Sequence, residues 1–127
     1  MRIEHIALWT KDLEQMKAFY EKYFNAVSNE KYTNTVKQFE SYFLSFDDGA
    51  RMELMTKPDL VNGDHRLALH GYAHFAFSVG SKEKVLEITE TLRVDGYTIH
   101  SEPRTTGDGY FESGILDPEG NLIEITI

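Results

Sequence analysis

The chain contains two copies of one pattern, and this internal repeat limits its possible folds more than any other property of the sequence. The first copy opens with Glu4-His5-Ile6-Ala7-Leu8 and reaches Arg51-Met52-Glu53-Leu54-Met55. The second opens with Ala73-His74-Phe75-Ala76-Phe77 and reaches Leu122-Ile123-Glu124-Ile125-Thr126. The two histidines are 69 positions apart and the two glutamates 71. A repeat of this size predicts one supersecondary unit used twice, with a histidine and a glutamate at matched places in each copy.

The predicted elements follow the same order in both copies: a strand, a helix and three further strands. In the first copy we expect a strand at 2–9, a helix at 12–24 capped by Thr10 or Asp12, and strands near 27–33, 37–46 and 50–56. In the second copy we expect a strand at 72–79, a helix from Ser81 to Asp95-Gly96, and strands near 97–102, 109–116 and 121–127. The Pro- and Gly-containing stretch 57–71 is the expected linker. The sequence therefore predicts an α+β fold, with one domain over 1–127 built from two βαβββ modules at about 1–60 and 70–127.

Length and composition narrow the class of protein. The 127 residues suffice for a buried core. The sequence has no run of eighteen apolar residues, so we expect no membrane span. The net charge of −8 and the absence of a basic patch argue against nucleic-acid binding. The chain has no cysteine, which excludes disulfides and thiolate chemistry, and the amino-terminal residues enter a strand pattern without a signal-peptide arrangement. We expect a cytoplasmic protein with a small-molecule substrate.

Strand alternation places the repeated histidines and glutamates on one kind of surface. In the strand at 72–79, the apolar residues Ala73, Phe75 and Phe77 share one face and His74 points to the other. The same alternation separates Glu124 from the neighbouring isoleucines, and it holds for the pair in the first copy. All four side chains are thus expected on the face away from the helices, which becomes a pocket lining if the sheet curls.

Two imidazoles and two carboxylates are a suitable ligand set for one divalent metal ion. A single histidine or glutamate in a strand is more often structural, but the repetition of the pair at matched places favours a metal site. His5, Glu53, His74 and Glu124 would fill four coordination positions and leave others for water or substrate. Such an ion polarises substrate oxygens and lowers the pKa of bound water.

The arrangement resembles the vicinal oxygen chelate superfamily, which includes glyoxalase I, bleomycin- and fosfomycin-resistance proteins and extradiol dioxygenases. The resemblance covers essentially the whole chain and rests on three stretches: Ile3-Glu4-His5-Ile6-Ala7-Leu8, Gly71-Tyr72-Ala73-His74-Phe75-Ala76-Phe77, and the segment from Gly109-Tyr110-Phe111 to Glu124. It implies an open, curled, eight-stranded mixed sheet (the glyoxalase-like fold) and a homodimer. The four ligands would come from one chain or from two, and the sequence is compatible with both.

Within the superfamily, the four-residue ligand set resembles the glyoxalase I branch. The resemblance implies a metal-dependent lyase or isomerase that acts on a small molecule with adjacent oxygens through a metal-bound enediolate. Glu124 is the expected base, with Glu53 as its partner, and Ni, Zn or Co is favoured over Fe or Mn. One alternative is a binding or resistance protein of the bleomycin or fosfomycin type; a second is a metal-dependent dioxygenase.

Two positions depart from the glyoxalase I pattern. The short bacterial enzymes of that branch have an Arg four residues after the first His and an Asn four residues after the first Glu, and these residues help to hold glutathione. Here the two places are Trp9 and Lys57. A substrate other than a glutathione adduct is therefore expected, and Trp9, Tyr72 and Arg104 are the candidate pocket residues. Arg104 belongs to a Gly-containing stretch, 104–109, for which we expect an ordinary turn, with a mobile substrate loop as the alternative.

Overall fold

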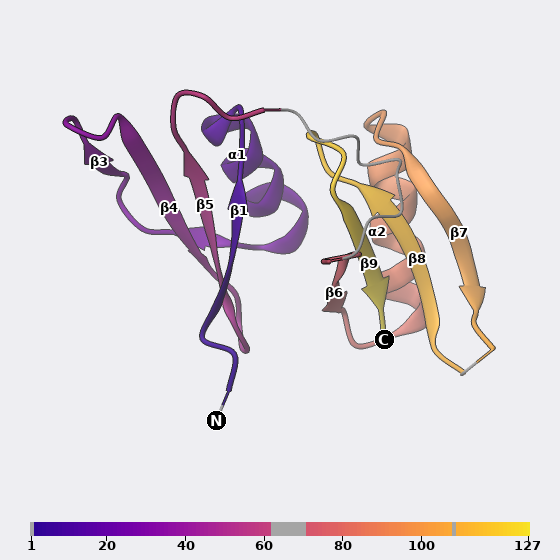
Figure 1. Ribbon diagram of the computed structural model, residues 1–127. Helices are drawn as coiled ribbons and strands as arrows, with labels where there is room; N and C mark the ends of the chain where they lie inside the picture. The colour runs from indigo at the N-terminus through magenta and orange to yellow at the C-terminus, as the bar shows by residue number, and fades with distance from the viewer. Residues whose placement is uncertain (1, 62–70, 108) are drawn as a thin grey trace. The chain divides into compact units, whose positions relative to one another are not determined.

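The computed structural model describes residues 2–61, 71–107 and 109–127, and it consists of two compact units, Met1–Gly63 and Asp64–Ile127. Each unit is a mixed β-sheet with one helix packed on one face (Figure 1). The predicted α+β class is confirmed. In the described residues, neither helix is both long and apolar enough to span a membrane.

The first unit contains a five-stranded sheet and one helix. Its elements are β1 (His5–Trp9), α1 (Leu13–Phe24), β2 (Val27–Ser28), β3 (Tyr32–Asn34), β4 (Phe39–Ser45) and β5 (Arg51–Thr56). The strand order is β1-β5-β4-β2, and β3 also pairs with β4. The β1–β5 pair is parallel and the other pairs are antiparallel.

The helix α1 begins and ends at defined caps. The Asp12 side chain accepts a hydrogen bond from the Gln15 backbone N–H at 2.9 Å, so Asp12 and not Thr10 is the N-cap. Asn25 ends the helix in the left-handed conformation, with φ of 53°. The buried face of α1 packs on the sheet, and the core of the unit is formed by Leu13, Met16, Phe19, Tyr20, Leu44, Met52 and Leu54.

The second unit repeats the plan with a four-stranded sheet. Its elements are β6 (Phe75–Ser78), α2 (Lys82–Val94), β7 (Ile99–Thr105), β8 (Phe111–Leu116) and β9 (Leu122–Thr126). The strand order is β6-β9-β8-β7, with β6 and β9 parallel. Ser81 caps α2 as predicted, by accepting a hydrogen bond from the Lys84 N–H at 3.2 Å.

The structure differs from the predicted strands in three places. The segment expected near 27–33 forms two short strands, because the Asn29 side chain accepts the Phe43 N–H at 2.8 Å and interrupts the ladder between them. The described residues therefore contain nine strands rather than eight. The strands β1 and β6 begin at His5 and Phe75, later than predicted. The strand β7 continues to Thr105, so Arg104 belongs to a strand and not to the expected turn.

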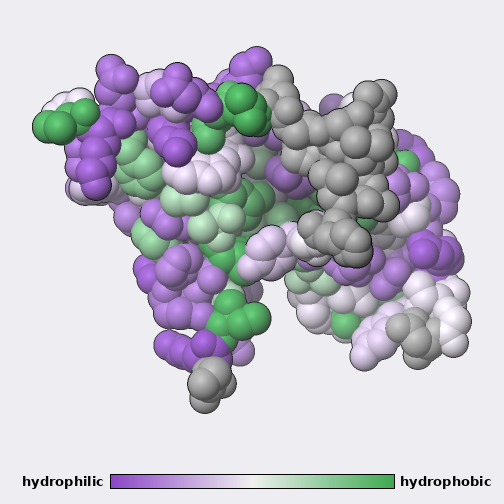
Figure 2. Space-filling model, in the orientation of Figure 1, coloured by the Kyte–Doolittle hydropathy of each residue, from purple (hydrophilic) through white to green (hydrophobic). Residues whose placement is uncertain are grey.

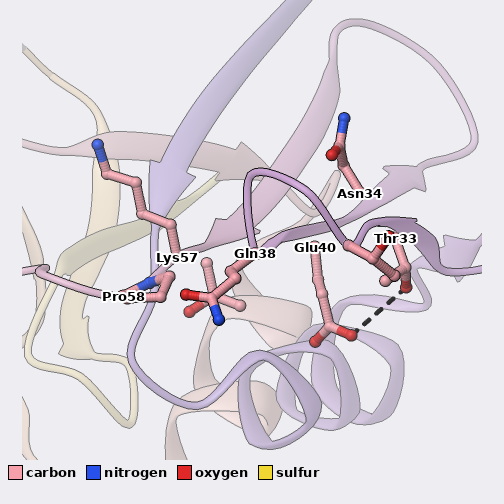
Figure 3. A pocket seen from close by; sticks show the side chains of 8 residues that line it. Thr33, Asn34, Gln38, Glu40, Lys57 and Pro58 are labelled. Carbon is pink, nitrogen blue, oxygen red and sulfur yellow. Dashed lines mark hydrogen bonds between the residues drawn. The ribbon is translucent and has the colours of Figure 1, made fainter.

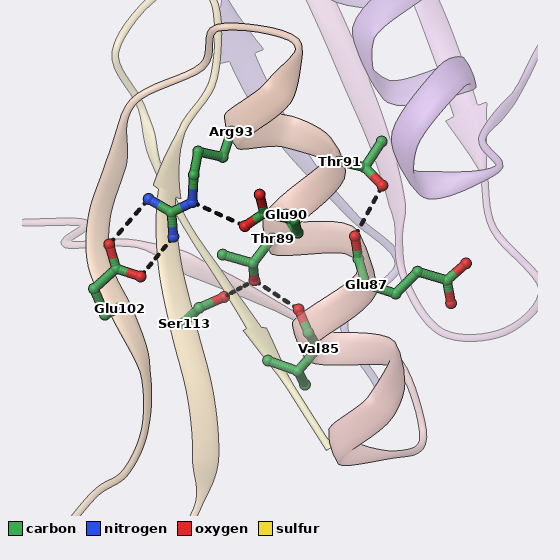
Figure 4. A network of polar contacts seen from close by, with 8 residues as sticks. All are labelled: Val85, Glu87, Thr89, Glu90, Thr91, Arg93, Glu102 and Ser113. Atoms are coloured by element: carbon green, nitrogen blue, oxygen red, sulfur yellow. Dashed lines mark hydrogen bonds and ion pairs between the residues drawn. The ribbon is translucent and has the colours of Figure 1, made fainter.

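One buried polar contact joins α2 to the sheet of the second unit. Thr89 Oγ1 donates to the Val85 carbonyl at 2.6 Å, and Ser113 Oγ lies 2.7 Å from Thr89 Oγ1 (Figure 4). Both side chains are buried among Val85, Leu92, Ile115, Ile123 and Ile125. Because Thr89 donates to Val85, Ser113 is the donor to Thr89, and the two hydroxyls satisfy each other inside the core.

We expect Thr89→Val to destabilise the second unit by about 1–3 kcal/mol, since the Ser113 hydroxyl is left buried without a partner. The double variant Thr89→Val/Ser113→Ala should recover most of this loss. Chemical denaturation measures both free energies of unfolding. The matched control is Thr91→Val, which removes an equivalent bond to the Glu87 carbonyl (2.8 Å) on the exposed side of α2; its effect should be below about 0.5 kcal/mol. Equal destabilisation in the single and double variants would contradict the assignment.

Candidate functional site

The parallel pair β1–β5 sets the geometry of the first candidate pair. In this register Ala7 lies opposite Glu53, and His5 lies opposite Arg51. Residues that are paired across adjacent strands project to the same face of the sheet. Met52 and Leu54, the sequence neighbours of Glu53, are buried. His5 and Glu53 therefore lie on the face opposite the helix, as strand alternation predicts.

The second unit repeats this register. The parallel pair β6–β9 places Ala76 opposite Glu124, and Ile123 and Ile125 are buried on the helix face. In both units the histidine comes two residues before the alanine that lies opposite the glutamate. The sequence repeat is thus a repeat of strand register. The sequence predicted His74 within a strand at 72–79. In the structure His74 immediately precedes β6.

Within the second unit the histidine and glutamate touch. His74 Nε2 lies 3.1 Å from Glu124 Oε2, and their side chains are 39% and 24% exposed. The imidazole and carboxylate therefore converge on a solvent-accessible point without any other protein group between them. Of the four predicted ligands, these are the two that a direct contact joins.

In the first unit the histidine contacts a residue that sequence reasoning missed. His5 Nδ1 lies 2.5 Å from the carboxylate of Glu4, which also pairs with Arg51. These two partners, His5 first, hold the pKa of Glu4 below its ordinary value. A carboxylate at Nδ1 selects the tautomer with the proton on Nδ1 and leaves the Nε2 lone pair available. The position of Glu4 directly before the histidine was the available signal, and the second copy has Ala73 there.

Glu53, unlike His5, has no side-chain partner among the described residues. Across the ranges that the structure describes, its carboxylate has no hydrogen bond or ion pair with a protein side chain, and no group of three His, Cys, Asp or Glu side chains converges as a metal cluster. The residue paired with Glu53 on β4 is Phe43, whose ring meets His5 edge-on at 5.5 Å between centroids. Glu53 is therefore bordered by an aromatic wall on one side.

The residue opposite Glu124 is a glycine instead. Gly114 of β8 pairs with Glu124, and a Cβ at this position would lie 2.6 Å from Ser101 Oγ of β7. The close approach of β7 leaves no room for a side chain there. The wall that Phe43 forms beside Glu53 thus has no counterpart beside Glu124.

A second carboxylate shares the face of Glu124. Glu112 pairs with Thr126, two residues along β9 from Glu124, so its side chain projects to the same side of the sheet. Its carboxylate lies 3.8 Å from the guanidinium of Arg104, the β7 residue paired with it. Arg104, predicted as a pocket residue, therefore lies on the site face beside Glu112. Tyr72, also predicted there, is completely exposed ahead of β6.

Trp9 lies on the site face of the first unit and is 48% exposed. The Lys57 ammonium is 4.7 Å from the centre of its ring, and Phe39 meets the ring edge-on at 6.2 Å. Figure 2 shows hydrophobic residues exposed among hydrophilic ones over the first unit. The two positions that depart from the glyoxalase I pattern are thus in contact with each other.

A cavity of about 480 Å³ lies at the β3–β4 end of the first unit (Figure 3). Its lining is almost entirely polar: Thr33, Asn34, Thr35, Gln38, Glu40, Thr56, Lys57 and Pro58. Glu40 pairs with Thr56 in the sheet, one residue beyond the Ser41–Met55 pair, so these two side chains project to the helix face. Neither His5 nor Glu53 lines this cavity, but one of its lining residues, Lys57, also contacts the Trp9 ring.

Comparison with known proteins identifies relatives of the whole chain. The model of the Glyoxalase/Bleomycin resistance protein/Dioxygenase superfamily matches residues 2–125. An uncharacterized Bacillus subtilis protein, YwkD, is 31% identical over 104 residues, which cover 81% of this chain and 80% of that protein. A glyoxylase/bleomycin resistance protein/dioxygenase domain from Frankia sp. EAN1pec superposes with a TM-score of 0.84 at 15% identity and covers 100% of this chain and 97% of that one.

Solved glyoxalase structures share the same fold. A glyoxalase family protein from Enterococcus faecalis gives a TM-score of 0.81 at 19% identity, over 99% of this chain and 97% of that chain. Glyoxalase I from Zea mays gives 0.81 at 22% identity over 98% of this chain. This chain spans only 44% of the maize protein.

The Glu4 contact makes a prediction about the His5 ring. At a pH where His5 is neutral, its proton should reside on Nδ1, and Glu4→Ala should shift it toward Nε2 because the accepting carboxylate is gone. Two-bond ¹H–¹⁵N NMR distinguishes the two tautomers directly. His74, which has Ala73 at the corresponding place, is the internal control and should keep its spectrum. An unchanged His5 tautomer in Glu4→Ala would contradict the assignment.

Proposed function

Because the chain belongs to the Glyoxalase/Bleomycin resistance protein/Dioxygenase superfamily, we propose that it is a metal-dependent lyase or isomerase of the glyoxalase type. Its substrate is a small molecule with two adjacent oxygens. The metal ligands are His5 and Glu53 from the first unit and His74 and Glu124 from the second. The observation that carries the proposal is the contact between His74 and Glu124.

The distance in that contact fits a ligand pair. Two ligand atoms about 2.1 Å from one divalent ion, at a right angle to each other, are about 3 Å apart. His74 Nε2 and Glu124 Oε2 are 3.1 Å apart. Both side chains are partly exposed, so an ion and a substrate can reach them. The pair is therefore spaced as neighbouring ligands without rearrangement of the strands.

The first unit supports the proposal by a different contact. A carboxylate at Nδ1 of a metal-binding imidazole orients the ring and raises the basicity of Nε2. Glu4 occupies this position beside His5. Glu53 contributes the second negative charge, so that two neutral imidazoles and two carboxylates balance a divalent cation. This nitrogen and oxygen donor set, without thiolate, suits Ni, Zn or Co.

A divalent ion at these residues would polarise the substrate oxygens and acidify the adjacent C–H. The chain itself must then move a proton between neighbouring carbons, and a carboxylate is the group for that step. Glu124, which contacts His74 directly, is the proposed base, as the resemblance to the glyoxalase I branch implies. Glu53, bordered by Phe43, is the proposed fixed partner.

The test of the ligand set is metal content. His5→Gln and His74→Gln should each weaken binding of Ni²⁺ or Zn²⁺ by at least about tenfold, because each removes one imidazole donor. Elemental analysis after dialysis against a metal buffer measures the stoichiometry and affinity. His100→Gln, which changes an exposed histidine of β7, is the matched control and should bind as the unaltered protein does. Unchanged affinity in either ligand variant would remove that histidine from the site.

The test of the base is proton exchange. In metal-saturated protein in D₂O, the hemithioacetal of methylglyoxal with 2-mercaptoethanol should exchange its C–H, and NMR follows the signal. Glu124→Gln should slow this exchange by about 10²–10⁴-fold, whereas Glu112→Gln, on the same face, should slow it less than about tenfold. Exchange at the original rate in metal-loaded Glu124→Gln would exclude Glu124 as the base.

A further inference from the structure

The first unit exposes a tryptophan on its candidate site face. Trp9 is the chain's only tryptophan, and its ring is half-exposed on the same sheet face as His5 and Glu53. Met52 and Leu54, on the helix face of the same strand pair, are buried, so the exposure of Trp9 does not result from a missing core.

Trp9 is part of a wider aromatic surface. Its ring meets Phe39 at 6.2 Å with an interplanar angle of 90°, and Phe39 meets Tyr32 at 6.1 Å. Tyr32 is 53% exposed. These three rings, from β1, β4 and β3, form an aromatic platform. Because neighbouring rings stand at 90° and 60° to one another, a flat apolar group can stack on one ring at a time.

A lysine at the platform lacks an acidic partner. In the portion of the chain that the structure describes, the Lys57 ammonium makes no ion pair or hydrogen bond, and it lies 4.7 Å from the centre of the Trp9 ring. Other cations of this acidic chain are neutralised: Lys31 by Glu14, Arg51 by Glu4 and Arg93 by Glu102. The Lys57 ammonium, attracted to the ring, keeps its N–H donors for a ligand anion.

The platform lies within reach of the proposed ligands. Trp9 pairs with Met55, two residues along the strands from the Ala7–Glu53 pair. At about 3.3 Å per residue, this is a separation of about 7 Å. A small molecule whose oxygens lie at the Glu53 row can therefore place a ring against Trp9.

We propose that the aromatic platform and Lys57 form the specificity subsite, and that the substrate is a small aromatic carboxylic acid. Its ring takes the place of the ammonium over the indole of Trp9, and the displaced ammonium donates to the carboxylate at the rim of the ring. The inference rests on the proposed function for the position of the reacting end of the molecule, and it adds the chemical class of the substrate.

The single tryptophan provides the readout. Titration with phenylacetate should change the intrinsic fluorescence in a saturable way. Phenylacetamide, which keeps the ring and lacks the charge, should bind about fivefold or more weakly, and acetate should produce no change. Lys57→Met should reduce the preference for phenylacetate over phenylacetamide to less than about twofold.

Lys82→Met is the matched control for Lys57→Met. Lys82 also places its ammonium over a ring, 5.0 Å from the centre of Phe111 in the second unit, so the variant loses the same charge and the same type of contact. It should keep the preference for phenylacetate. Equal loss of preference in both variants would mean that net charge, and not Lys57, selects the anion, and the proposal would be wrong.

Two further outcomes would overturn the inference. One is the absence of a saturable response to phenylacetate in both metal-free and Ni²⁺-loaded protein. The other is a Trp9 emission that acrylamide cannot quench, because the platform would then be covered by protein, such as a second copy of the chain. Neither result bears on the metal ligands. Conversely, unchanged metal affinity in His5→Gln together with selective phenylacetate binding would refute that ligand and leave the subsite standing.

Discussion

The parallel pairing of the first and last strands of each unit is the constraint on which the candidate site depends. In both units this pairing places an alanine opposite the glutamate and the histidine two residues earlier. A slip of one residue would exchange the two faces of a strand and would bury the glutamate against the helix. The isoleucine, leucine and methionine side chains beside each glutamate prevent the slip, because their burial in the core is possible in one register only. The apolar core therefore determines where the polar groups lie.

Much of this arrangement could be predicted because it follows from period and repetition. Alternation along β5 and β9 was sufficient to assign Glu53 and Glu124 to the face away from the helices, and the cap at Ser81 followed from local chemistry. The break between β2 and β3 could not be predicted, because it depends on a hydrogen bond that the backbone N–H of the distant Phe43 donates to the Asn29 side chain. The extension of β7 through Arg104 depends likewise on pairing with Glu112 of β8. Long-range hydrogen bonds decide such boundaries.

In the candidate site too, some features follow from the sequence pattern and others depend on contacts that only the structure shows. The sequence suggested the four proposed ligands, and alternation predicted the sheet faces of His5, Glu53 and Glu124. It could not show that His74 and Glu124 touch, or that Glu4 and not another residue supports His5, because both depend on side-chain conformation. Trp9 and Lys57 stood out in the sequence only as departures from a pattern. Their contact across the strands β1 and β5 makes them one structural feature.

The glycine opposite Glu124 has a consequence for how a duplicated scaffold diverges. Two copies of one unit are initially identical, and each supplies one histidine and one glutamate. Phe43 pairs with Glu53, whereas Gly114 pairs with Glu124. This difference makes the two glutamate environments unequal, although both units keep the histidine and the glutamate. One carboxylate then lies beside an aromatic ring, and the other lies beside a glycine whose missing side chain is replaced by the Ser101 hydroxyl. The two units can therefore acquire different roles through substitutions at the residues paired with the glutamates, while the glutamates themselves stay unchanged.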